Sequence, residues 1–170
     1  WEPPVDFVRG IAQGIAERCA VYNAELVGGD LTRSDSLVIN VTAMGSLGGS
    51  GAPLTLDGAR AGQKLVAHGK IGYSGAGLAL LQRFGRALPP ELEELWPLID
   101  AHCAPTLSPG RGVIARATGS TAMTDNSDGL VRDVGHLAQR SGVRIDLDRA
   151  AIAPDPLLAA AGAVLDIDPW

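Results

Sequence analysis

The sequence predicts an α/β or α+β fold organised in two domains. Beyond residue 60, segments with the strand pattern alternate with segments whose apolar residues recur at helical spacing. The preceding stretch Gly45–Gly58 is rich in glycine and contains Pro53, which is typical of a boundary between domains. The chain has 170 residues, 46% of them hydrophobic and 19% charged, which indicates a folded protein and not a disordered one.

The N-terminal part predicts one helix and a pair of strands. Apolar residues recur every three or four positions over residues 5–22, which indicates an amphipathic helix. The run Glu25–Asp30 is short and apolar, and Ser36–Met44 is rich in β-branched residues. We therefore expect two strands joined by a polar turn.

The C-terminal part predicts alternating elements. The same patterns indicate strands at residues 63–68, 121–124 and 143–147, and helices at residues 74–84, 90–101, 113–118, 128–140 and from 156 onward. Aromatic residues make up only 4% of the chain, so aliphatic and alanine side chains are expected to form most of the core.

Composition restricts the partners and the compartment. The net charge is −5 and there is no Lys/Arg cluster, which argues against a nucleic-acid partner. No apolar run approaches the roughly 20 residues that span a bilayer. Cys19 and Cys103 are too few for a disulfide scaffold, so we expect buried free thiols and a reducing cytoplasm. The chain begins at Trp1 without an initiating Met and ends at Trp170 without a terminal signature, and we expect it to be part of a longer protein.

The first candidate site is Gly28-Gly29-Asp30. Two glycines allow a ligand close to the backbone and leave N–H groups free for a phosphate, and the carboxylate that follows can hold Mg²⁺. An ordinary turn between strands has the same composition, and for this motif alone the turn is the favoured interpretation.

The second candidate site is the segment Asp125–Leu130 (DNSDGL). Asp125 and Ser127 share a face of an extended chain, and Ser127 and Asp128 stand where the N-cap of the next helix belongs. Two carboxylates and a hydroxyl at a helix N-terminus suit a metal-bridged polyphosphate. The alternative is that Ser127 or Asp128 only caps the helix, and the two interpretations are evenly balanced.

Other motifs favour structural roles. The stretch Gly69–Gly77 (GKIGYSGAG) is glycine-rich but lacks the ending of a phosphate-binding P-loop, so packing is the better explanation. The three histidines, His68, His102 and His136, lie in separate elements without metal-ligand spacing.

Four stretches, read in order, carry a family pattern. They are Val27–Arg33 (VGGDLTR), Asp57–Gln63 (DGARAGQ), Gly72–Leu78 (GYSGAGL) and Thr124–Leu130 (TDNSDGL), the last followed by Asp133, Gly135 and His136. Together they resemble the thiamine-monophosphate kinase family, within the aminoimidazole-ribonucleotide-synthetase-like ATP-binding superfamily. The first and last stretches are similar to the wider superfamily, whereas the combination with Ser74 and the Gly135-His136 pair points to the kinase.

The resemblance implies a two-domain synthetase-like fold. Residues 1–49 correspond to the end of an N-terminal ATP-binding and dimerisation domain, and residues 50–170 to an incomplete C-terminal α/β domain with a mixed sheet. It implies that Gly29, Asp30 and Ser127 bind ATP and that Asp30, Asp125 and Asp128 bind Mg²⁺. One departure is Leu56, which stands where the family has an arginine that contacts ATP.

The activity implied by the resemblance is phosphorylation of thiamine monophosphate to thiamine diphosphate, with ATP and Mg²⁺, in a homodimer that binds neither nucleic acid nor membrane. The phosphoryl group passes in line and directly to the acceptor phosphate, and no general base is needed because that acceptor is already ionised. Two alternatives stay open. One is another superfamily enzyme, of the aminoimidazole ribonucleotide or selenophosphate synthetase type, and the other is a non-catalytic nucleotide-binding paralogue, which Leu56 keeps open.

Overall fold

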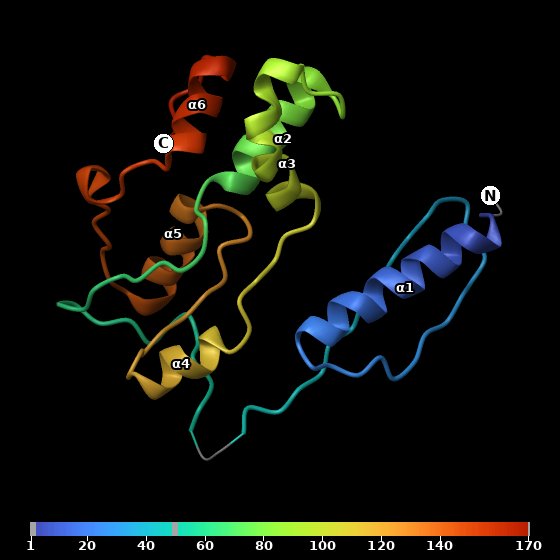
Figure 1. The fold of residues 1–170 in the computed structure, drawn as a ribbon. Helices are drawn as coiled ribbons and strands as arrows, with labels where there is room; N and C mark the ends of the chain where they lie inside the picture. The colour runs from blue at the N-terminus through green and yellow to red at the C-terminus, as the bar shows by residue number, and fades with distance from the viewer. Residues whose placement is uncertain (1–2, 49–50, 170) are drawn as a thin grey trace. The chain divides into compact units, whose positions relative to one another are not determined.

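The computed structural model describes residues 3–48 and 51–169 and divides the chain into two units (Figure 1). Unit 1 comprises Trp1–Ala52 and unit 2 comprises Pro53–Trp170. The boundary predicted between residues 49 and 50 lies outside the described residues. None of the described helices is long and apolar enough to cross a bilayer.

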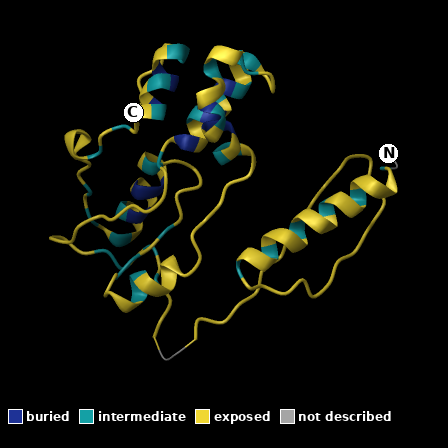
Figure 2. Cartoon of the chain, viewed as in Figure 1, coloured by how far each residue is buried: buried dark blue, intermediate teal, exposed yellow. Residues whose placement is uncertain are grey.

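Unit 1 contains the helix α1 (Val5–Val21), which confirms the helix predicted there. Pro4 stands at its N-cap, and Asp6 in the first turn accepts a hydrogen bond from Arg9 at 2.7 Å. The side chains of Ile11, Ile15 and their helical neighbours are half-buried along one face, as the spacing predicted. No residue of the range 3–48 is fully buried, so this helix is not enclosed within unit 1 (Figure 2).

The strand pair predicted after α1 is not present in the structure. Residues 24–48 contain no strand among those described, and the apolar segment expected to pair is exposed, with Val38 at 73% and Val41 at 67%. A strand is stabilised by a neighbouring strand and by the side chains of its face, and β-branched composition alone supplies neither.

Unit 2 is built from helices, and the helices predicted there are confirmed with small shifts of their ends. The helices of unit 2 are α2 (Tyr73–Phe84), the 3₁₀ helix η1 (Pro90–Leu95), α3 (Trp96–Cys103), α4 (Arg111–Ala117), α5 (Leu130–Ser141), the 3₁₀ helix η2 (Arg149–Ala151) and α6 (Pro156–Leu165). The short helix η2 was not predicted. The single helix predicted over 90–101 is divided into η1 and α3. Pro97 has no N–H for the carbonyl four residues before it, so an α-helix cannot run unbroken through this point.

The predicted mixed sheet of the α/β fold is wrong for the residues that the structure describes. The segments 63–68, 121–124 and 143–147 form no strands, and the β-structure there is one isolated parallel bridge between Thr55 and Ala122. In that bridge the Met123 N–H donates to the Thr55 carbonyl at 3.2 Å. Among the described residues, the other segments form no backbone ladder with a neighbour, and an unpaired segment is not a stable strand.

The core of unit 2 lies where α2 packs against α3 and α6 (Figures 1 and 2). Leu80, Leu95 and Leu98 are completely enclosed there. The buried members of this cluster are Tyr73, Leu80, Leu95, Leu98, Ile99, Leu158 and Ala161. As the composition predicted, aliphatic and alanine side chains dominate it.

Gly77 sets how closely α2 and α3 approach. A Cβ atom placed on Gly77 would lie 2.0 Å from the Leu98 carbonyl oxygen and 3.1 Å from the His102 Cβ. The first contact is with backbone, which cannot rotate away as a side chain can. The absence of a side chain at Gly77 is therefore a condition for this helix pair.

We expect Gly77→Ala to destabilise unit 2 by about 1–3 kcal/mol, because the added methyl group forces α2 and α3 apart. Urea unfolding measures the change. Gly75→Ala on the same helix is the matched control, since a Cβ there meets nothing within 4 Å and alanine favours a helix by about 0.5–1 kcal/mol. Equal stability of the two variants would contradict this account of the crossing.

Candidate functional site

The acidic loop Asp125–Gly129 leads directly into α5 and is exposed to solvent. The N-cap of α5 is Gly129, whose φ of 116° and ψ of 146° are accessible to glycine and costly for other residues. Gly129 has no side chain, and neither Ser127 nor Asp128 occupies the N-cap position. The interpretation in which one of these two residues serves only as the helix cap is therefore not supported.

Asp133, in the first turn of α5, takes the role that a capping side chain would have. Its Oδ2 atom accepts the backbone N–H of Asp128 at 3.0 Å and that of Gly129 at 3.1 Å. The side chain is 7% exposed and is a buried acidic residue in unit 2. Sequence reasoning noted Asp133 in the family pattern but gave it no role. A related signal was available, since the acidic residue of a capping box, three positions after the N-cap, reaches back to the N-cap N–H, and Asp133 stands one position further along.

Asp125 is held in its ionised form. The hydrogen bond from the Ser127 hydroxyl lowers the pKa of Asp125 below its ordinary value, and a backbone hydrogen bond and Thr124 lower it further, against a small opposing effect of desolvation. The Ser127 hydroxyl therefore stabilises the ionised Asp125 side chain. An ionised carboxylate is the form that binds a cation.

Asp128 lies beside a basic side chain of α5, that of Arg132. The Arg132 Nε lies 3.7 Å from the Asp128 Oδ2, and both side chains are exposed. An ion pair at such a surface contributes little, typically about 0–1 kcal/mol. A metal ion competing for Asp128 would therefore displace only a weak partner.

The donor atoms of the loop fit a hard divalent cation. Carboxylate oxygens are the ligands that Mg²⁺ prefers, and Mg²⁺ is commonly held by one or two carboxylates together with water and substrate phosphates. Within residues 3–48 and 51–169, no three His, Cys, Asp or Glu side chains gather into a set that could hold a metal ion. The loop therefore offers part of a coordination shell, which phosphates would complete.

The second motif, Gly28-Gly29-Asp30, lies in unit 1 on an exposed stretch without regular structure. The Asp30 Oδ1 accepts the Leu31 N–H at 2.9 Å, and space is open around Gly28 and Gly29. This leaves room for a ligand at the backbone. The convergence of Asp30 with Asp125 and Asp128 on one cation stays a prediction.

The glycine-rich stretch Gly69–Gly77 has the packing role that the sequence favoured. Gly72 has a φ of 85° immediately before α2, and Gly77 allows the helix crossing described above. The Ser74 Oγ lies 3.0 Å from the His102 Nδ1, which ties α2 to α3. The thiols differ from expectation, because Cys103 is exposed and Cys19 is half-buried, although both are free.

Leu56 is tied to the far end of α5. Its carbonyl oxygen accepts the Ser141 hydroxyl at 2.6 Å, and the Ala59 N–H donates to the same hydroxyl at 3.0 Å. The 12 residues of α5 span about 18 Å, and the acidic loop stands at the opposite end. Residue 56 therefore lies beside the end of α5 that is remote from Asp128.

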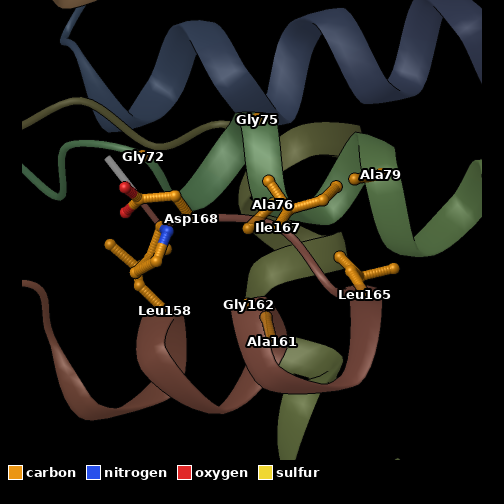
Figure 3. A pocket seen from close by; sticks show the side chains of 11 residues that line it. Gly72, Gly75, Ala76, Ala79, Leu158, Ala161, Gly162, Leu165, Ile167 and Asp168 are labelled. Atoms are coloured by element: carbon orange, nitrogen blue, oxygen red, sulfur yellow. The ribbon is translucent and has the colours of Figure 1, made fainter.

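A cavity of about 220 Å³ lies between α2 and α6. Small side chains of α2, such as Ala76 and Ala79, face the aliphatic side chains of α6, such as Leu158 and Leu165 (Figure 3). The carboxylate lining it, Asp168, accepts two hydrogen bonds from Arg149 at 2.9 and 2.6 Å. None of the predicted site residues lines this cavity, and its apolar wall does not suit a polyphosphate.

Comparison with known proteins finds close relatives along nearly the whole chain. A thiamine-monophosphate kinase of Corynebacterium glutamicum is 64% identical over 167 residues, which are 98% of this chain and 50% of that relative. One from Mycobacterium tuberculosis is 40% identical over 170 residues, 99% of this chain and 49% of the relative. One from Escherichia coli is 32% identical over 150 residues, 85% of this chain and 44% of the relative.

The family profile described as AIR synthase related protein, N-terminal domain, matches residues 1–47. No solved structure is a significant match. The chain spans about half the length of the curated relatives it matches. The family resemblance drawn from the four motifs is confirmed by these identities.

We expect Ser127→Ala to raise the pKa of Asp125 toward the ordinary carboxyl value, because the hydroxyl that stabilises the ionised form is removed. A carboxyl NMR titration of the metal-free protein measures this. A lowered folded-state pKa stabilises the fold above the unfolded-state pKa, and this contribution is lost as pH falls through the folded-state pKa. The stability difference between wild type and variant should therefore vanish at low pH. An unchanged Asp125 titration would contradict the assignment.

Proposed function

We propose that this chain, which is homologous to thiamine-monophosphate kinases along nearly its whole length, is part of an enzyme that phosphorylates thiamine monophosphate to thiamine diphosphate with ATP. The observation that carries the proposal is the 64% identity over 98% of the chain to a relative of that name. The four motifs that carry the family resemblance lie in the expected order, which agrees with the proposal.

The residues that would bind ATP in this proposal belong to two motifs. They are Gly29 and Asp30 of the first motif and Ser127 of the acidic loop. The open space around Gly29 supports the first contact, because a phosphate can reach the backbone N–H groups there. The exposure of Ser127 supports the second.

Mg²⁺ is the cation that the carboxylates would hold, with Asp30, Asp125 and Asp128 as its ligands. When bound, Mg²⁺ neutralises charge on the phosphates and helps to orient them. The ionised state of Asp125 supports this role, and so does the weak ion pair that Asp128 would exchange for the metal.

The chain's own residues act by positioning. The acceptor of the transfer is a phosphate oxygen that is ionised at neutral pH, so no side chain has to remove a proton from it. In this proposal the acidic loop supplies the oxygen atoms that would hold the cation, and the phosphoryl group passes directly and in line to the acceptor without a covalent intermediate. We therefore assign no catalytic acid or base.

A homodimer in the cytoplasm completes the proposal. Unit 1 exposes a run of large apolar side chains, which a second copy of the protein would cover. They include Leu37, Val38, Ile39, Val41 and Met44. Exposed apolar patches of this kind mark interaction surfaces. The acidic net charge and the scarcity of cysteines favour a reducing compartment and no nucleic-acid partner.

The test of the function is an assay of the full-length protein with ATP, Mg²⁺ and thiamine monophosphate. We expect ADP release that depends on thiamine monophosphate, thiamine diphosphate as product, and loss of both on removal of Mg²⁺ with EDTA, since the carboxylates alone cannot neutralise the phosphates. ATP binding without ADP release would favour a non-catalytic paralogue. Turnover with a different acceptor would favour another enzyme of the superfamily.

We expect Asp125→Asn to lower kcat about 100-fold, which corresponds to about 2.7 kcal/mol, because the swap keeps the size of the side chain and removes its charge from the cation. Steady-state kinetics at limiting Mg²⁺ measure the effect, and circular dichroism checks the fold. Asp146→Asn is the matched control, since Asp146 is also an exposed aspartate but pairs with Arg144 at 2.8 Å. Normal turnover of Asp125→Asn would show that Asp125 is only a turn residue and does not hold the cation.

A further inference from the structure

We propose that Asp133 is a positioning residue, which fixes the direction in which the Asp128 side chain leaves the backbone and so presents it to the cation. The proposal rests on the proposed function in one respect, namely that Asp128 is a ligand of Mg²⁺. Its structural part stands on the hydrogen bonds of the acidic loop alone.

The first argument is geometric. The N–H of Asp128 belongs to the peptide plane before its Cα, and the N–H of Gly129 belongs to the plane after it. Both donate to the same oxygen, the Asp133 Oδ2, at 3.0 and 3.1 Å. Holding both planes fixes the φ and ψ of Asp128, and these two angles determine the direction of its Cα–Cβ bond. The direction in which the exposed Asp128 side chain leaves the backbone is thus set, and χ1 and χ2 then place its carboxylate.

The second argument is that Asp133 is itself anchored. Its N–H donates to the Gly129 carbonyl at 2.9 Å, which closes a ring of hydrogen bonds between the loop and the first turn of α5. Val134 and Leu137 on the same helix are buried. The loop is therefore connected to a packed face of the helix.

The third argument concerns the free-energy cost of burying the Asp133 carboxylate. A carboxylate that is 7% exposed has given up most of its hydration, which is unfavourable unless hydrogen bonds replace it. Two backbone N–H groups and the N-terminus of α5 supply that replacement. A side chain serving only the helix could remain exposed and cap it from outside. The buried position instead holds the Asp133 carboxylate against the backbone N–H groups of the loop.

The hydrogen bonds of Asp133 leave the side-chain oxygens of Ser127 and Asp128 available to a ligand. Because Asp133 engages the backbone N–H groups, the side chains of Ser127 and Asp128 are not used as caps of α5. Their oxygens stay exposed at the surface. Residues that orient metal ligands in this way typically affect metal affinity by about 10–100-fold.

The experiment uses the full-length protein and three variants. Asp133→Ala removes the acceptor. Asp133→Asn keeps one oxygen, and one oxygen is enough for both hydrogen bonds. Leu137→Ala is the matched control, because it removes a buried side chain of α5 without touching the loop. Amide exchange by NMR reports on the backbone, and electron paramagnetic resonance with Mn²⁺ alone reports on cation binding without any turnover.

We expect the amides of residues 128 and 129 to be protected in the wild type and in Asp133→Asn, although the loop is exposed. In Asp133→Ala they should exchange freely, and Mn²⁺ should bind about 10–100-fold more weakly. Leu137→Ala should lose stability but keep its Mn²⁺ affinity. In kinetics, Asp133→Ala should raise the Mg²⁺ concentration needed for half-maximal rate more than it lowers kcat.

Three results would overturn the proposal. The first is wild-type exchange at residues 128 and 129 as fast as at exposed Asn126, which decides the matter even if Asp133→Ala does not fold. The second is wild-type Mn²⁺ affinity in folded Asp133→Ala. The third is equal weakening of Mn²⁺ binding in Leu137→Ala, which would reduce Asp133 to a stabilising residue. If the expected Mn²⁺ results occur without any ADP release, the proposed function fails and the role of Asp133 stands.

Discussion

Helices α2 and α3 cross at a residue without a side chain, and the core of unit 2 is arranged around that crossing. Gly77 brings the backbone of α2 against the Leu98 carbonyl, which places Leu80 and Leu98 inside the interface. The third helix of the cluster, α6, covers the remaining side of α2 with Leu158 and Ala161. A cavity of about 220 Å³ remains between α2 and α6 beside this contact.

The acidic loop depends on a different kind of contact. The buried Asp133 carboxylate holds the backbone of the loop. Gly129, which has a positive φ, allows α5 to begin directly after the loop. Both contacts are made by residues of the chain itself. The same arrangement explains why Ser127 and Asp128 can be both adjacent to a helix start and available to a ligand.

The sequence predicted the helices well because their information is local. Apolar spacing, acidic first turns and proline positions determined α1, α2 and α5 within a few residues. The predicted strands failed because β-structure depends on a partner elsewhere in the chain, and segments such as Ser36–Met44 have none among the described residues. At the candidate site, the sequence predicted that Asp125–Asp128 lead into a helix, and α5 begins at Leu130, whereas the metal and ATP contacts stay predictions. The role of Asp133 was missed because it acts through backbone N–H groups, which a residue pattern does not display.

The exposed apolar run of unit 1 has a consequence for how the protein behaves while it folds. No charged residue lies between Asp35 and Asp57, and Leu37–Val41 within this interval is exposed. Charges and prolines beside such runs normally keep newly made chains from sticking to one another. Here Asp35 and Pro53 are the nearest such residues on either side. Freshly synthesised copies at high local concentration would therefore form aggregates through this interval unless it is covered promptly, so yield in production should fall with expression rate and temperature.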